Sequence, residues 1–496
     1  MNDFKKLAGQ TVIYGLGTMV PRLLNYLLLT PYFLYSLFSE AHQEYGKVTE
    51  LYAYITFLMI LLTLGMETTY FRFMSGNKDK VKVYNTILTT LLFVSALFLI
   101  LILVFTPQVA HLLKYDGEPI FIQLLAGILA VEAFSAIPFA RLRIENRAMR
   151  FAVLKFIHVI LNISLMLGIY NFGPKVLGYN TYLLNEEGII SARFIFLANF
   201  LSSSVILLLL IPELRNFRIQ HFSFKYLFPI LVYGLPLMIS GLAGTINETL
   251  DRSIYKHIIS DQNVALYELG IYGANYKLGG LILIFVQMFR YAAEPYFFSK
   301  SRDVDAKEQY ALLMNIFVGL ILALSLFILL FLNYLKFFIS PGYHEGLFVV
   351  PYIVMAYILY GVLFYQSIWY KLSNRTNYAL IIMLIGALFT VVINVYFVTQ
   401  YRYGASAIAH VISYGMMVLV SYFLGQKYYP VPYNLSRIGL YMIVAFSIYV
   451  INRLITVDKL LFDLLIKSVL LLLFLTFVSW KEGLLKMFFI HDRKNR

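Results

Sequence analysis

The chain has no cysteine, and only 13% of its 496 residues are charged. Without cysteine there is no disulfide framework, no thiol nucleophile and no Cys-based metal site. Apolar residues make up 60% of the chain, so the composition excludes both a disordered protein and an ordinary soluble domain.

Several short motifs of enzymes are also missing. No G-x-x-x-x-G-K-[ST] loop is present, so nothing indicates ATP hydrolysis, and neither H-E-x-x-H nor G-x-S-x-G occurs. We therefore expect a protein that is not an enzyme, with no catalytic residues, no metal and no cofactor. Energy for any transport would come from an ion gradient, a substrate gradient or a partner.

Long apolar runs dominate the sequence. About fourteen stretches of roughly 20 to 30 residues follow one another, each long enough to cross the hydrocarbon layer as a helix. The predicted spans are 11–38, 45–71, 84–112, 119–140, 151–172, 190–212, 226–255, 266–298, 309–339, 347–370, 376–400, 404–426, 438–452 and 460–480. We expect an all-α, multi-pass membrane protein.

The basic residues predict how the chain is oriented. A net charge of +14 would suggest nucleic acid for a soluble domain, but here Lys and Arg lie in short loops, so no nucleic-acid partner is expected. They are concentrated on one side, for example in 141–150 and 215–225, and are fewer on the other, where we place Lys47, Lys114 and Lys256. The excess predicts that both termini are cytoplasmic, and the N-terminus shows no removable signal peptide.

A weak internal repeat divides the chain. YGLGTMV (14–20) resembles YGLPLMI (233–239), EYGKVTELY (44–52) resembles ELGIYGANY (268–276), and ETTYF (67–71) resembles EPYF (294–297). Six spans separate the copies, so both enter the membrane in the same direction, as in transporters with a substrate site between two halves. We predict an N-terminal bundle at 1–222, a C-terminal bundle at 223–430, and two peripheral helices with a cytoplasmic tail at 431–496.

Charged and amide residues inside the spans are the candidate site residues, because an isolated charge in the bilayer is costly. Five are candidates for substrate binding in a central cavity: Arg22, Asn25, Arg252, Lys277 and Arg290. Six are candidates for gating or ion coupling: Glu67, Glu132, Asn247, Glu248, Asp251 and Glu294.

Each of these groups has a purely structural alternative. Arg22, beside Pro21, could form a buried pair with Glu132 or Glu67 instead of facing a cavity. The spacings of three and four residues place much of 247–252 on one helix face, where Asp251 could pair with Arg252 or with Lys277.

The remaining polar groups within the spans have similarly open interpretations. Arg290 and Glu294 are four residues apart and could pair at the inner interface instead of contacting substrate. His158 with Asn162, and His410 with Ser413, could relay protons, although buried and hydrogen-bonded histidines are the favoured interpretation.

The chain resembles the polysaccharide transport proteins of the multidrug, oligosaccharidyl-lipid and polysaccharide exporter superfamily. The resemblance lies in GQTVIYGLGTMVPRLL (9–24), DRSIY (251–255), ELGIYGANYKLGG (268–280) and RYAAEPYFF (290–298). It implies two six-helix bundles around a central cavity, two peripheral helices and alternating access.

The resemblance also implies a function, a location and partners. The substrate would be an undecaprenyl-pyrophosphate-linked oligosaccharide, flipped outward across the bacterial inner membrane for lipopolysaccharide O-antigen, capsule or exopolysaccharide assembly. Expected partners are this lipid-linked glycan, membrane lipid, a coupling ion (H⁺ or Na⁺) and the polymerase with its chain-length machinery. A pyrophosphate needs cations in the cavity, which agrees with the basic residues inside the spans.

The sequence leaves three alternative functions open. A multidrug antiporter of the same superfamily would need carboxylates for cationic drugs, and the spans contain several. A lipid II flippase shares the pyrophosphate and polyprenyl chemistry. An integral membrane glycosyltransferase or polymerase is disfavoured, because the longest predicted outer loop is only 173–189.

Overall fold

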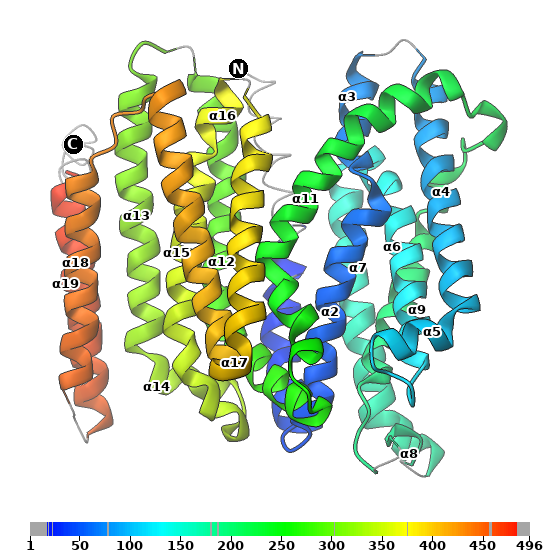
Figure 1. Ribbon diagram of the computed structural model, residues 1–496, viewed down its shortest axis with the longest axis horizontal. Coiled ribbons are helices and arrows are strands. Elements are labelled where there is room, and N and C mark those ends of the chain that lie inside the picture. The colour runs from blue at the N-terminus through cyan, green and yellow to red at the C-terminus, as the bar shows by residue number, and fades with distance from the viewer. Residues whose placement is uncertain are drawn as a thin grey trace, which may run out of the picture. The chain divides into compact units, whose positions relative to one another are not determined.

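The computed structural model describes residues 17, 19–21, 23–76, 79–178, 181–185, 188–301, 303–373, 375–455 and 459–483 (Figure 1). Regular structure in these residues is helical, apart from one isolated antiparallel bridge between Leu184 and Ile190. Eleven helices of the described part are long and apolar enough to cross a membrane. The expectation of an all-α, multi-pass membrane protein is confirmed.

The chain divides into two compact units, Met1–Gly270 and Ile271–Arg496. The main helices of the first unit are α2 (His42–Thr63), α3 (Met66–Gly76), α4 (Lys80–Val104), α5 (Thr106–Leu112), α6 (Ile120–Ile144), α7 (Ala148–Leu167), α8 (Gly173–Leu177), α9 (Arg193–Leu209), α10 (Ile211–Leu214) and α11 (Phe224–Ile258), followed by the start of α12 (Gln262–Lys300). The boundaries at 222 and 430 were predicted from the internal repeat of the sequence. The division into two six-helix bundles stays a prediction.

Helix α6 lies at the centre of the first unit. It packs against α4, α9, α2 and α7, and Figure 1 shows these helices running side by side. Its sequence is apolar on nearly all sides, as expected of a helix surrounded by others. The centre of this unit is therefore built mainly from apolar packing, with Glu132 as a polar residue midway along α6, and larger polar clusters lie at the two ends of α6.

A short break separates α2 from α3. Leu64 and Gly65 both have positive φ, at 51° and 66°, which ends α2. A Cβ added to Gly65 would lie 2.5 Å from the carbonyl oxygen of Gly234 in α11. This close approach of α11 needs a residue without a side chain at Gly65.

The second unit contains the rest of α12, then α13 (Ala306–Leu330), α14 (Leu332–Leu335), α15 (Val350–Gln366), α16 (Ile368–Leu372), α17 (Asn377–Tyr428), α18 (Leu435–Leu454) and α19 (Leu460–Lys481). Within it α15 packs against α17, and α18 and α19 pack against α13. Arg402, with φ 53° and ψ −149°, interrupts the 52-residue α17 between the predicted spans 376–400 and 404–426.

Most of the predicted spans correspond to helices of similar extent, with two exceptions. The predicted span 190–212 contains the shorter α9, and positions 11–16, 18 and 22 of span 11–38 lie outside the described residues. The total of fourteen spans therefore stays a prediction.

Candidate functional site

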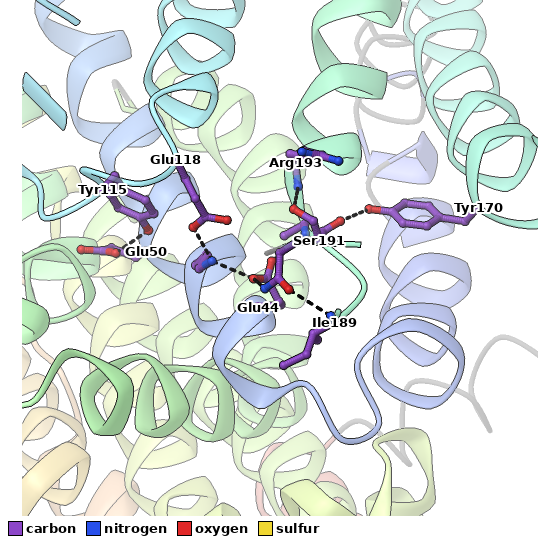
Figure 2. A network of polar contacts seen from close by, with 11 residues as sticks. Glu44, Glu50, Tyr115, Glu118, Tyr170, Ile189, Ser191 and Arg193 are labelled. Carbon is purple, nitrogen blue, oxygen red and sulfur yellow. Dashed lines mark hydrogen bonds and ion pairs between the residues drawn. The ribbon is translucent and has the colours of Figure 1, made fainter. Parts of the chain in front are cut away.

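A buried carboxylate organises one end of the first unit. The Glu44 side chain accepts hydrogen bonds from Lys47 Nζ at 2.7 Å, from Asn185 Nδ2 at 3.2 Å and from the backbone N–H of Ala192 at 2.7 Å. Lys47 also forms an ion pair with Glu118, just before α6 (Figure 2). These contacts join the start of α2 to the two connections that precede α6 and α9.

A second buried ion pair lies further along α2. Lys256 Nζ is 2.9 Å from Glu50 Oε2, and neither side chain has any exposed surface. The Tyr115 hydroxyl donates to the same carboxylate at 2.7 Å, and Lys256 Nζ lies 3.5 Å from the centre of the Tyr115 ring. Burial, together with the Glu50 carboxylate, raises the pKa of Tyr115 well above its usual value, so its hydroxyl stays protonated and donates.

The connection before α9 is held by its own hydrogen bonds. The bridge between Leu184 and Ile190 closes a tight turn, and the Tyr170 hydroxyl donates to the Ser191 carbonyl at 2.7 Å (Figure 2). Arg193 Nη2 donates to the Tyr182 carbonyl at 2.6 Å. This part of the predicted loop 173–189 is therefore fixed against the helix ends.

These elements enclose a cavity of about 440 Å³. Four carboxylates, two lysines, four amide side chains and two aromatic side chains line it: Glu40, Glu44, Asp116 and Glu118; Lys47 and Lys114; Gln43, Asn185, Gln262 and Asn263; and Tyr115 and Tyr267. Its volume is within the range of small-molecule sites, and its lining is more polar than is usual for them.

The other end of α6 carries an arginine cluster around Glu213, whose side chain is completely buried. Arg147 Nη1 lies 3.1 Å and Arg150 Nε 2.7 Å from the Glu213 carboxylate. Arg141 Nη1 and the Tyr84 hydroxyl donate to the Glu213 backbone carbonyl at 2.6 and 2.9 Å. One carboxylate thus fixes part of the basic segment 141–150.

Glu67 and Glu132, the two carboxylates that were considered as buried partners of Arg22, have other contacts. Glu67 forms an ion pair with Arg143, and both side chains are nearly half exposed. Glu132 accepts a hydrogen bond from the Ser203 hydroxyl at 2.8 Å, and that hydroxyl lies 3.2 Å from His158 Nε2. Glu67 and Glu132 are therefore not brought together, and Arg22 itself lies outside the described residues.

The polar cluster of α11 is brought together. Arg252 Nε lies 3.4 Å from Asp251 Oδ1, and Arg252 also donates to the Glu248 carbonyl. Asn247 is buried and donates to the Ala243 carbonyl at 3.0 Å. The pairing of Asp251 with Arg252, one of the two interpretations of this cluster, is present.

The other candidates lie on separate segments. Asn25 is half-buried, and Lys277 is half-buried in α12. Arg290 is exposed, and its guanidinium lies 5.6 Å from the centre of the Phe364 ring within the second unit. The Glu294 side chain lies outside the described residues, so its pairing with Arg290 stays a prediction.

The buried ion pairs of Lys47 and Lys256 were not predicted from the sequence. Lys47 and Lys256 were placed in loops, but both are buried in helices, because each has a carboxylate partner that offsets the cost of burial. The spacing of three residues from Glu44 to Lys47 was a usable signal. The sequence held no comparable signal for the ion pair of Glu50 with Lys256, because the two residues are far apart in the chain.

No group of three or more His, Asp or Glu residues in the described part could hold a metal ion.

Solved membrane transporters share the fold. The lipid II flippase MurJ, in an inward closed conformation, superimposes with a TM-score of 0.67 at 15% identity, covering 95% of this chain and 99% of that one. An inward-facing multidrug resistance MATE family transporter of the MOP superfamily gives a TM-score of 0.61 at 17% identity, covering 84% of this chain and 97% of the transporter. A MATE structure in complex with MaD3S gives 0.60 at 18% identity, with coverage of 85% and 95%.

Sequence comparison identifies the family. No curated protein matches the chain. A family model described as polysaccharide biosynthesis protein matches residues 7–301, which is more than half of the chain. The family predicted from the sequence is thereby confirmed: this chain belongs to the polysaccharide biosynthesis protein family and has the fold of the MOP superfamily transporters.

Proposed function

We propose that the protein moves an undecaprenyl-pyrophosphate-linked oligosaccharide from the cytoplasmic to the outer leaflet of the bacterial inner membrane by alternating access. One combination carries this proposal: the chain belongs to a polysaccharide biosynthesis family, and its fold is that of a solved lipid II flippase. A protein of this fold in a polysaccharide biosynthesis family is suited to moving a lipid-linked glycan across the membrane. This movement needs no covalent chemistry.

The cations within the helices suit the pyrophosphate part of this substrate. Arg252, Lys277 and Arg290 lie on α11 and α12, and guanidinium groups bind phosphates through paired, charge-assisted hydrogen bonds. The polyprenyl chain would stay in the bilayer while the head group crosses. We assign these three residues, with Arg22 and Asn25, to substrate binding.

Orientation, coupling and partners complete the proposal. The basic segment 141–150 would face the cytoplasm together with both termini, and the cavity bordered by Glu44 and Glu118 would face outward. Glu67, Glu132, Asn247, Glu248, Asp251 and Glu294 are proposed to serve gating or coupling to H⁺ or Na⁺. The flipped product would pass to a polymerase and its chain-length machinery for O-antigen, capsule or exopolysaccharide assembly.

A multidrug cation antiporter is the second candidate. The similarity to solved multidrug transporters and the carboxylates Glu248 and Asp251 of α11 favour it.

Deletion of the gene in its host separates the two candidates. The flippase proposal expects loss of surface polysaccharide with accumulation of the lipid-linked precursor, both reversed by the wild-type protein. Normal polysaccharide together with increased sensitivity to cationic drugs would favour the antiporter.

A further inference from the structure

The cavity at the start of α2 has a lining that suits one part of a glycolipid and not the other. We propose that it is a binding site for uncharged sugar residues of the glycan head group, and that it does not bind the pyrophosphate. This inference rests on the proposed function, and it assigns a separate site to the sugar end of the substrate.

Charge excludes the phosphate part. Four carboxylates line the cavity against two lysines and His42, and Lys47 shares its single charge between Glu44 and Glu118. The other lysine, Lys114, donates to the Lys256 carbonyl at 3.0 Å. A pyrophosphate here would face an excess of like charge at short range.

The rest of the lining favours a polyhydroxylated ligand. Amides such as Gln43 and Gln262 supply both donors and acceptors, and carboxylates such as Glu40 accept from hydroxyl groups. Tyr267 adds an aromatic ring to the lining, and the centre of this ring lies 5.0 Å from that of His42. A sugar ring has an apolar C–H face and a polar hydroxyl edge, so an aromatic side chain with amides around it matches both surfaces.

The walls of the cavity are fixed before any ligand arrives. Glu44 is held by three donors, and Lys47 links it to Glu118, another residue of the cavity lining (Figure 2). A Cβ added to Gly46 would lie 1.9 Å from the carbonyl oxygen of Leu266, so the backbones of α2 and the first turns of α12 are in direct contact. Such preorganisation lowers the entropic cost of binding.

Under the proposed orientation this end of the first unit faces outward. The sugar residues would reach it as the head group leaves the membrane, so the site would hold the leading end of the glycan while the pyrophosphate is still within the spans. Sugar specificity would then depend partly on this cavity and not only on the cationic residues.

Cysteine protection on the purified full-length protein tests the site. The chain has no cysteine, and a Cβ at Gly117, which lines the cavity, would meet no atom within 4 Å, so Gly117→Cys is a single, well-tolerated reporter. Its rate of maleimide modification is measured with the oligosaccharide released from the host's lipid-linked precursor, and separately with inorganic pyrophosphate. Val304→Cys, in an exposed connection of the second unit, is the control reporter.

The oligosaccharide should slow modification of Gly117→Cys about tenfold at about ten times its Kd, because only the unoccupied fraction reacts. Val304→Cys should be unaffected. Adding Tyr267→Ala should remove the protection, while Tyr267→Phe, which keeps the ring, should retain it.

Two results would overturn the inference. Protection by pyrophosphate equal to or greater than that by the oligosaccharide would show an anion site. Absence of protection by the oligosaccharide, in a protein that still restores surface polysaccharide to the deletion host, would remove the sugar site and leave the proposed function intact.

Discussion

Gly46 and Gly270, which match in the internal repeat predicted from the sequence, pack against each other. A Cβ on Gly270 would lie 2.1 Å from the His42 carbonyl oxygen and 3.3 Å from the Gly46 backbone nitrogen. A Cβ on Gly46 would likewise approach the Leu266 carbonyl oxygen. The glycines of the EYG and ELG segments therefore each lie where the backbone of the other helix approaches closely.

Replacing Gly46 by alanine should destabilise the protein. The added Cβ meets backbone atoms that cannot rotate away, and such overpacking costs about 1–3 kcal/mol. The thermal unfolding midpoint of the purified protein measures the effect. Gly280→Ala in α12 is the matched control, because its Cβ would meet nothing within 4 Å, and alanine is the better helix former by about 1 kcal/mol. Equal midpoints for Gly46→Ala and the wild type would refute the close contact.

Replacing one residue of the Glu50–Lys256 pair should lower the stability of the protein more than replacing both. Lys256→Met leaves the Glu50 carboxylate buried without its cation, at a cost of about 3–5 kcal/mol. The double variant Lys256→Met with Glu50→Gln should regain much of that loss, because no charge is left buried. A double-mutant cycle on unfolding midpoints measures the coupling between the two residues. Additive effects would show that the two side chains do not interact.

Glu132→Gln tests a role in transport, and Glu67→Gln tests the contribution of an ion pair to stability. Glu132 lies in α6 beside Ser203 and His158, so Glu132→Gln should remove any proton-dependent component of transport if this carboxylate couples the gradient. Glu67→Gln should change stability by less than about 1 kcal/mol, because its pair with Arg143 is nearly half exposed. Transport rates at two pH values in vesicles measure the effect of Glu132→Gln, and the thermal unfolding midpoint measures that of Glu67→Gln. An unchanged pH response in Glu132→Gln would exclude this residue as the coupling site.

Arg290 should be needed for transport of the pyrophosphate head group. Loss of a charge-assisted hydrogen bond costs about 1.5–3 kcal/mol, so Arg290→Ala should reduce precursor transport by about tenfold or more, with Arg290→Lys retaining part of the rate. Lys80→Ala, at the exposed start of α4, is the control for a general loss of positive charge. Equal transport by Arg290→Ala and Lys80→Ala at matched expression would remove Arg290 from the site.

Hydropathy alone predicted the class of fold, because an apolar run long enough to span the bilayer can only be a helix or part of a closed barrel. Hydropathy also predicted a boundary between the spans 376–400 and 404–426. At Arg402, between these spans, the backbone of α17 leaves the helical region. The family was recognisable from segments such as ELGIYGANYKLGG, which include Gly270 at the contact with α2.

The buried polar network was not predictable in the same way. A charge near a helix end is usually read as a loop residue, and only the folded chain reveals that Glu50 meets Lys256 or that Ala192 donates to Glu44. The cavity depends on four separate segments meeting at one place, namely the residues around 40–47, 114–118, 185–189 and 262–267. No pattern within any one of these segments indicates it.

The most direct test of the proposed function is reconstitution of the purified protein into liposomes that contain the host's lipid-linked oligosaccharide. Exposure of the glycan on the outer surface is followed with a membrane-impermeant sugar-modifying enzyme. If the protein is a flippase, the fraction of glycan that the enzyme reaches should rise from about half towards completion in proteoliposomes, while protein-free liposomes stay near half, because a lipid-linked head group does not cross an apolar bilayer unaided. An accessible fraction equal to that of protein-free liposomes, with efflux of a cationic dye from the same proteoliposomes, would contradict the account.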